Sequence, residues 1–190
     1  KQLSINGAMN VALIHFGKEQ RSIDALRREI NDWSGLENLD LAKVVSTEKK
    51  YEWKHNTWLK KNIDTSNKSY KVTCLDFGVK HNILRNLHEQ NLNPTILNLS
   101  SSFDEILETK PDGIFLSNGP GDPYATGEKI INTLKKLIEI NIPIFGICLG
   151  HQILSMALGA KTKKMFQGHR GSNHPVKNLI NDFVEITSQN

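Results

Sequence analysis

The feature that most constrains this chain is a regular alternation of short apolar runs with amphipathic stretches between residues 70 and 160. Four apolar runs predict strands at residues 72–75, 95–99, 113–116 and 142–147. Four stretches with helical periodicity predict helices at residues 82–89, 103–109, 128–140 and 149–158. Strands that are apolar throughout are typical of sheets covered on both faces, and this alternation requires crossovers between parallel strands. We therefore predict an open, mostly parallel α/β sheet flanked by helices, with ligand-binding loops at the carboxyl ends of the strands.

The composition changes near residue 60 and predicts a division of the chain. Residues 60–69 contain one apolar side chain in ten and predict a solvated linker. Residues 1–59 are then expected to be the C-terminal part of a smaller N-terminal domain, and residues 70–190 the α/β domain. Because the chain starts at Lys1 and stops at Asn190, directly after a strand-like run, we expect a piece of a longer protein. A targeting signal would lie upstream of this piece.

The upstream region carries weaker signals. Residues 11–16 predict a strand, and residues 23–30 predict a helix whose first turn Ser22 can cap with its hydroxyl. Aromatic side chains mostly serve cores and interfaces, so we expect this region to be packed by its three tryptophans. These are Trp33, Trp53 and Trp58.

Composition narrows the possible classes of protein. The hydrophobic set makes up 38% of the residues, which excludes wholesale disorder. No apolar run approaches the roughly 18 residues that a membrane-spanning helix needs, so we expect no membrane partner. The formal net charge of +4 is mild and the basic residues are scattered, so we expect no nucleic-acid partner. Two cysteines alone predict neither a disulfide framework nor a metal site, and they favour a reducing compartment such as the cytoplasm.

The sharpest local feature is the stretch Gly146-Ile147-Cys148-Leu149-Gly150 between a predicted strand and a predicted helix. It is the cysteine form of the G-x-S-x-G nucleophile elbow, whose flanking positions must be small because the strand turns at once into the helix. The turn would expose the sulfur at a helix N-terminus, where the partial positive charge favours a thiolate. A structural cysteine at a tight turn is the alternative. Cys74, inside a strand, is predicted to be an inert core residue.

A second feature follows the predicted strand at residues 113–116. Residues 117–123 (SNGPGDP) contain two glycines and two prolines, which predict a rigid turn with bare backbone N–H groups. Such groups can bind an anion or polarise a carbonyl. The turn ends a strand at the same sheet edge as Cys148, so we consider it an oxyanion candidate.

No histidine stands out as a general base. His151 lies about one helical turn beyond Cys148, where its side chain is predicted to point along the helix rather than over the sulfur. His169 and His174 lie in a predicted loop at residues 168–175, which can line a site or bind a partner. The sequence thus predicts a nucleophile and an oxyanion loop without a convincing base.

Several stretches resemble a known family. Residues 146–152 (GICLGHQ) are similar to the nucleophile motif of the class I, triad-type glutamine amidotransferases. Three further stretches resemble the small, glutamine-hydrolysing subunits of carbamoyl-phosphate synthases, namely residues 76–83 (DFGVKHNI), 116–123 (LSNGPGDP) and 168–176 (GHRGSNHPV). Upstream, residues 40–43 (DLAK) and 51–53 (YEW) resemble the end of the N-terminal domain of such subunits.

The resemblance implies a flavodoxin-like amidotransferase domain that hydrolyses glutamine to glutamate and ammonia. Ammonia would pass to a large partner subunit, which would bind ATP and magnesium and make carbamoyl phosphate for arginine and pyrimidine synthesis. This chain itself would hold no cofactor. Cys148 would form a thioester, and the N–H groups of Leu149 and Gly119 would hold the oxyanion. The implied glutamine-binding residues are Gly119, Gly121, Leu149, Gln152 and Asn190.

This sequence also departs from the family pattern in three places. The family's His-Gly-Phe after Asn190, its catalytic His-x-Glu and a serine contact from the upstream domain are not present in this sequence. Because loss of the base of such a triad costs several orders of magnitude in rate, we expect the chain as given to hydrolyse glutamine negligibly.

Three other interpretations stay open at this point. A different class I amidotransferase, feeding anthranilate or guanylate synthesis, is disfavoured by the three further stretches. A cysteine peptidase on a similar sandwich would use the same elbow but leaves residues 117–123 unexplained. A non-enzymatic chain would only bind and stabilise a large synthetase subunit through its tryptophans and residues 168–175.

Overall fold

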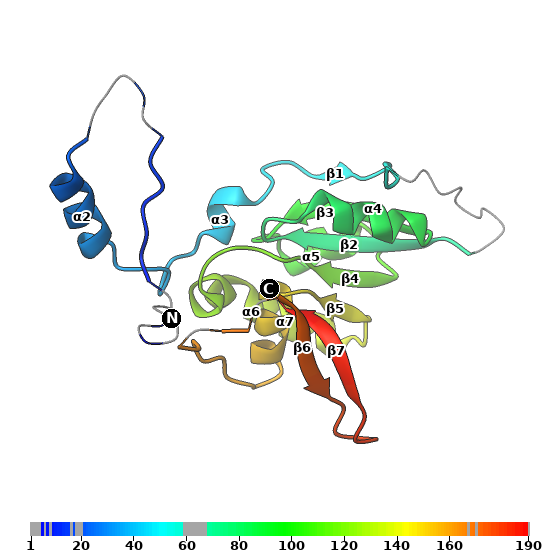
Figure 1. Cartoon of the computed structure of the whole chain (residues 1–190). Helices are drawn as coiled ribbons and strands as arrows, with labels where there is room; N and C mark the ends of the chain where they lie inside the picture. The colour runs from blue at the N-terminus through cyan, green and yellow to red at the C-terminus, as the bar shows by residue number, and fades with distance from the viewer. Residues whose placement is uncertain are drawn as a thin grey trace. The chain divides into compact units, whose positions relative to one another are not determined.

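The chain folds as two compact units in the structure, a computed structural model that describes residues 5, 7, 9–15, 17, 21–58, 68–166, 168–169 and 171–189 (Figure 1). The larger unit is Leu36–Thr162. The smaller unit combines Lys1–Gly35 with Lys163–Asn190. Across the described residues, no helix is both long and apolar enough to cross a membrane.

The larger unit is built on a five-stranded sheet with the strand order β1-β3-β2-β4-β5. Its strands are β1 (Tyr51–Glu52), β2 (Tyr70–Asp76), β3 (Leu92–Asn98), β4 (Gly113–Leu116) and β5 (Ile144–Gly146). Its helices are α3 (Ala42–Val45), α4 (His81–Glu89), α5 (Phe103–Glu108), α6 (Pro123–Glu139) and α7 (Leu149–Ala157). Strands β2 to β5 pair in parallel, and β1 pairs antiparallel with β3. The predicted mostly parallel α/β class is confirmed, although β3 and α6 begin earlier than predicted and β5 is shorter.

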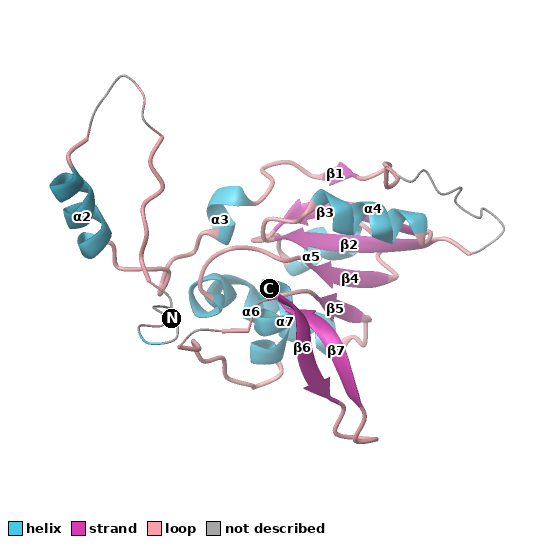
Figure 2. Cartoon of the chain, viewed as in Figure 1, coloured by secondary structure: helices cyan, strands magenta, loops and turns pink. Residues whose placement is uncertain are grey.

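Helices cover both faces of this sheet, as the apolar strands predicted (Figure 2). Successive side chains of a strand point to opposite faces, so β2, β3 and β4 each contribute buried side chains to two hydrophobic clusters. The cluster beneath α4 contains Trp53, Val72, Cys74, Leu84, Ile96 and Phe115. The cluster beneath α5, α6 and α7 includes Leu75, Leu97, Ile106, Leu116, Leu134 and Ile153.

Strand order brings three loops to one edge of the sheet. The chain runs outward from β2 to β3 and then returns to place β4 on the other side of β2, which makes a topological switch point between β2 and β4. Leu75 pairs with Leu116, and Leu116 pairs with Gly146, so the loops after β2, β4 and β5 begin at neighbouring positions. Ligands of open α/β sheets bind at such a crevice.

Residues 36–58 pack with the sheet, which differs from the predicted division of the chain at residue 59. Ala42 is fully buried in the cluster beneath α6, and Trp53 is buried in the cluster beneath α4. Strand β1 extends the sheet beside β3. The reason for the difference is that residues far downstream bury these apolar side chains. Local composition does not show such long-range contacts. The predicted linker at residues 60–69 lies outside the described residues except for its last two.

The smaller unit corrects two other predictions. Residues 11–15 form no strand and are exposed, because no strand among the described residues takes up their backbone hydrogen bonds; Phe16 lies outside the described residues. The predicted loop at residues 168–175 is largely strand β6 (Gly171–Lys177), which pairs antiparallel with β7 (Val184–Gln189). The predicted helix is confirmed as α2 (Ile23–Asp32), and the Ser22 hydroxyl accepts a hydrogen bond from the Ala25 N–H at 3.2 Å.

The tryptophan prediction is confirmed for one residue only. Trp53 is 8% exposed and its indole N–H donates to the carbonyl of His55 at 2.8 Å. Trp33 and Trp58 are 47% and 85% exposed. Of the three, only Trp53 therefore contributes to a core.

Candidate active site

Cys148 occupies the turn between β5 and α7 in a strained backbone conformation. Its dihedral angles are φ 55° and ψ −113°, and its side chain is exposed. A non-glycine residue with positive φ stores strain that the surrounding structure must hold in place, and such residues concentrate at functional sites. The elbow predicted from the sequence is thus present, with its cysteine in a strained conformation.

The two glycines that flank the elbow sit against backbone. A β-carbon at Gly146 would lie 2.7 Å from the carbonyl carbon of Gly150 and 2.7 Å from the nitrogen of His151. A β-carbon at Gly150 would lie 2.6 Å from the carbonyl carbon of Leu116 in β4. Both contacts are far inside van der Waals distance, which confirms the predicted need for small residues at these positions.

The first turn of α7 presents donors beside Cys148. The Gln152 N–H donates to the Cys148 carbonyl at 3.0 Å, so the helix begins directly at the cysteine. Among the described residues, the Leu149 N–H donates no hydrogen bond to the protein, as expected for the first position of a helix. The positive end of the helix dipole favours an anion at this point.

Cys74 provides the contrast that the sequence predicted. Its side chain is fully buried within β2. Burial, together with the nearby charge of Asp76, raises the pKa of the Cys74 thiol well above its ordinary value. Cys148 is therefore the accessible thiol of the two.

The loop after β4 lies against the loop after β2. A β-carbon at Gly119 would lie 2.7 Å from the β-carbon of Phe77, so the two loops approach closely. The Asn118 amide joins them: its nitrogen donates to the Gly78 carbonyl at 3.1 Å, and its oxygen accepts from the Lys80 N–H at 3.0 Å. Among the described residues, the Gly119 N–H donates no hydrogen bond to the protein and stays available to a ligand.

Asp76 anchors the loop after β2 and ties it to the upstream segment. One carboxylate oxygen accepts from the N–H groups of Gly78 at 2.9 Å and Val79 at 2.8 Å. The other oxygen accepts from the Thr47 N–H at 2.8 Å. The sequence analysis gave no role to Asp76 or Asn118; the available signal was a polar residue at the end of a buried strand or within two positions after it.

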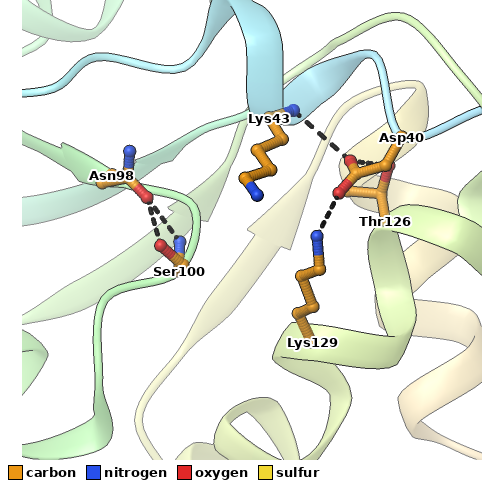
Figure 3. Close-up of polar contacts among 6 residues, drawn as sticks. All are labelled: Asp40, Lys43, Asn98, Ser100, Thr126 and Lys129. Carbon is orange, nitrogen blue, oxygen red and sulfur yellow. Dashed lines mark hydrogen bonds and ion pairs between the residues drawn. The ribbon is translucent and has the colours of Figure 1, made fainter.

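Asp40 fastens the upstream segment to α6 (Figure 3). Its carboxylate accepts from Lys129 Nζ at 2.7 Å, Thr126 Oγ1 at 3.0 Å and the Lys43 N–H at 3.3 Å. Burial opposes ionisation of Asp40, but these hydrogen bonds and the Lys129 charge outweigh it and lower the pKa of the carboxyl below its usual value.

A second upstream contact reaches the loop after β4 itself. The Asp122 N–H donates to the Leu39 carbonyl at 3.0 Å. The Asp122 side chain caps α6 by accepting from the Tyr124 N–H at 2.8 Å, and it also accepts from the Asn38 N–H at 2.8 Å. Residues 38–43 therefore shape the outer side of the loop that carries Gly119 and Gly121.

The structure brings most of the predicted site residues to one sheet edge. The Gly150 N–H donates to the Ser117 carbonyl at 3.1 Å, which joins the elbow to the loop after β4. This edge carries Gly119, Gly121, Cys148, Leu149 and Gln152. Asn190 lies outside the described residues.

The three candidate bases lie in different units of the chain. His151 is exposed on α7, and the rings of His169 and His174 meet edge to face at 5.3 Å within the smaller unit. Within the described residues of the larger unit, no histidine hydrogen-bonds the Cys148 thiol. The described part of the chain holds no group of three or more histidine, cysteine or acidic side chains that could bind a metal ion.

Comparisons with known proteins agree with this geometry. The profile of the family described as Glutamine amidotransferase class-I matches residues 73–190. Carbamoyl phosphate synthase small chains from Zymomonas mobilis subsp. mobilis and Bartonella bacilliformis are 49% and 50% identical over 187 and 186 residues. The protein of that name from Rhizobium meliloti is 47% identical over 189 residues. Each alignment covers 97% of this chain, which spans about half the length of these relatives: 50%, 47% and 47% respectively.

The similarity to one solved structure is weaker than these sequence similarities. A crystal structure from Thermoplasma acidophilum, described as that of a GMP synthase protein, aligns with 58% of this chain and 52% of its own. The sequence identity is 26% and the TM-score is 0.43. A likeness of that size does not by itself establish a shared fold.

Proposed function

Because the chain belongs to the class I glutamine amidotransferase family, we propose that Cys148 is the nucleophile of a glutamine-hydrolysing reaction. Family membership confirms the resemblance predicted from residues 146–152. The observation that carries the proposal is the elbow itself, which holds an exposed cysteine in a strained conformation at the first turn of α7. A cysteine packed only for stability does not require this conformation.

The reaction would proceed through a thioester. The Cys148 sulfur would attack the side-chain amide carbon of glutamine, and the carbonyl π pair would move to the oxygen. The N–H groups of Leu149 and Gly119 would stabilise this oxyanion. Return of the electron pair would break the C–N bond, and the nitrogen would leave as ammonia after taking a proton. Water would then cleave the thioester, release glutamate and restore the thiol.

The remaining site residues would bind the substrate. Gly121 lies in the same loop as Gly119, and Gln152 lies one turn along α7 from Cys148, so both can contact a glutamine seated above the elbow. Asn190 is the further contact that the family resemblance implies. These assignments are part of the proposal and are tested by substitution.

The names of the relatives suggest where the ammonia goes. Carbamoyl phosphate synthase small chains match this chain over nearly its whole length, so we propose that the protein supplies ammonia for carbamoyl phosphate synthesis. A large partner subunit would carry that synthesis and bind ATP and magnesium.

The test is release of glutamate and ammonia from glutamine. In the longer protein assembled with its partner, Cys148→Ser should lower turnover by at least about 10⁴-fold, as loss of a nucleophile does in comparable triads. Cys74→Ser is the matched control and should retain the wild-type rate, because Cys74 is buried away from the elbow. Full turnover by the Cys148 variant would refute the proposal.

The 190-residue chain alone tests the expectation about the base. Because this sequence lacks the His-x-Glu that the family resemblance implies, its turnover should be several orders of magnitude below that of the longer protein. Near-normal turnover by this chain would show that the base lies within it.

A further inference from the structure

A buried hydroxyl lies directly behind the proposed oxyanion donor. Ser117 is the first residue after β4 and is fully buried. Its hydroxyl oxygen lies 2.9 Å from the Phe77 nitrogen and 2.8 Å from the Asn118 carbonyl oxygen. Its own carbonyl accepts from Gly150 in α7, so Ser117 contacts the loops after β2, β4 and β5 at once.

The direction of both hydroxyl bonds is determined by chemistry. The Phe77 N–H can only donate, so it occupies a lone pair of the Ser117 oxygen. The Asn118 carbonyl can only accept, so the hydroxyl proton must point to it. The Ser117 hydroxyl therefore has one satisfied arrangement and does not rotate freely.

The acceptor of that proton belongs to a functionally important peptide group. The carbonyl of Asn118 and the N–H of Gly119 are two ends of one trans peptide, and they point in opposite directions. Holding the carbonyl from the buried side thus aims the Gly119 N–H outward. A hydrogen bond to the carbonyl also polarises the peptide and strengthens its N–H as a donor.

We infer that Ser117 is a positioning residue that orients and polarises the Asn118–Gly119 peptide for oxyanion stabilisation. The inference rests on the proposed use of the Gly119 N–H in the reaction of Cys148. Ser117 touches no substrate, because its side chain is fully buried. Its effect should therefore be confined to reactions of Cys148 that develop an oxyanion.

Two reactions of the same thiol separate this role from a general effect on the elbow. In acylation by p-nitrophenyl acetate, the sulfur adds to the ester carbonyl, an oxyanion forms, and its collapse expels p-nitrophenolate and leaves a thioester. In alkylation by iodoacetamide, the S–C bond forms as the C–I bond breaks and iodide leaves, without an oxyanion. Both reactions use the 190-residue chain and need no glutamine. Buried Cys74 should react with neither reagent, and the Cys148→Ser chain measures the background rate of each reaction.

We expect Ser117→Ala to lower the ratio of acylation rate to alkylation rate by about 10-fold, less than the 10²- to 10³-fold typical when a donor is deleted. Ser117→Thr keeps the hydroxyl and should keep a ratio near that of the wild type. Thr73→Val is the matched control, because it removes another buried hydroxyl from the sheet and should leave the ratio unchanged.

An unchanged ratio in Ser117→Ala would overturn the inference. So would a Ser117→Thr chain that alkylates normally yet loses acylation, or an equal loss in the Thr73 control. The ratio is counted only for a Ser117→Ala chain whose urea unfolding transition shows that it is folded. If that chain does not fold, the Ser117→Thr chain decides, and loss of its acylation at a normal alkylation rate overturns the inference. If Cys148 is acylated as expected but the longer protein assembled with its partner releases no glutamate from glutamine, the proposed function is refuted and the Ser117 inference stands.

Discussion

Gly150→Ala tests whether the elbow is held by contact with β4. The new methyl group would lie 2.6 Å from the carbonyl carbon of Leu116 and 2.7 Å from its β-carbon. An ordinary contact begins near 3.4 Å, so α7 would have to move away from β4 by close to 1 Å. Leu116 is fully buried in a central strand and cannot yield.

The expected change in the free energy of unfolding is the sum of opposing contributions. Ala in place of Gly favours a helix by up to about 1 kcal/mol, and less near the helix end. Overpacking costs about 1–3 kcal/mol. Movement of α7 also weakens the hydrogen bonds from Gly150 to Ser117 and from Ile147 to Leu116, each worth about 1 kcal/mol. We expect the free energy of unfolding to fall by about 2–4 kcal/mol.

Gly127→Ala in α6 is the matched control. There the new methyl group would meet Ile131 Cδ1 at 3.3 Å and Met156 Cε at 3.5 Å, both ends of flexible side chains. Its stability should be unchanged or raised by up to about 1 kcal/mol.

Urea unfolding followed by tryptophan fluorescence measures both variants, and buried Trp53 reports the transition. With a slope of about 3 kcal/mol per M, a loss of 3 kcal/mol lowers the midpoint by about 1 M. If Gly150→Ala is as stable as the wild type, or if Gly127→Ala loses as much, the steric argument is wrong.

Three further predictions concern charge, capping and thiol access. The lowered pKa of Asp40 means that its ionised form stabilises the fold above the usual value of 3.8, and that this contribution is lost as pH falls through the lowered pKa. Asp40→Asn should therefore cost about 1 kcal/mol at pH 7 and flatten the acid dependence of urea midpoints below about pH 5; an unchanged dependence contradicts this. Asp122→Ala removes the cap of α6 and should cost about 1–2 kcal/mol in the same assay. Asp122→Asn keeps one oxygen to accept from the Tyr124 N–H but loses the acceptor for the Asn38 N–H, so it should cost less than Asp122→Ala; equal losses would show that the cap is unimportant. Iodoacetamide followed by mass spectrometry should label Cys148 and spare Cys74 until urea unfolds the chain, and early label on Cys74 would disprove its burial.

The sequence alone determined those features whose cause is local. A run of apolar residues or a helical period is complete within its own segment, so the sheet and the helices from residue 70 to 160 were predictable. The elbow is equally local, because a strand, two glycines and a helix surround Cys148 within a few residues. Cys74 was recognised as a core residue for the same reason, since it sits inside an apolar strand.

Only the tertiary structure decided the features that depend on distant partners. Ala42 and Trp53 are buried in the cores of the larger unit because β3 and the helices, far along the chain, pack against them. Residues 11–15 have a strand-like composition, but no strand among the described residues pairs with them. Ser117 gains its role from Phe77, 40 positions away, which fixes the direction of its hydroxyl proton. A hydrogen bond or a buried surface requires two partners in contact. A single sequence segment contains only one of these partners when the other lies far along the chain.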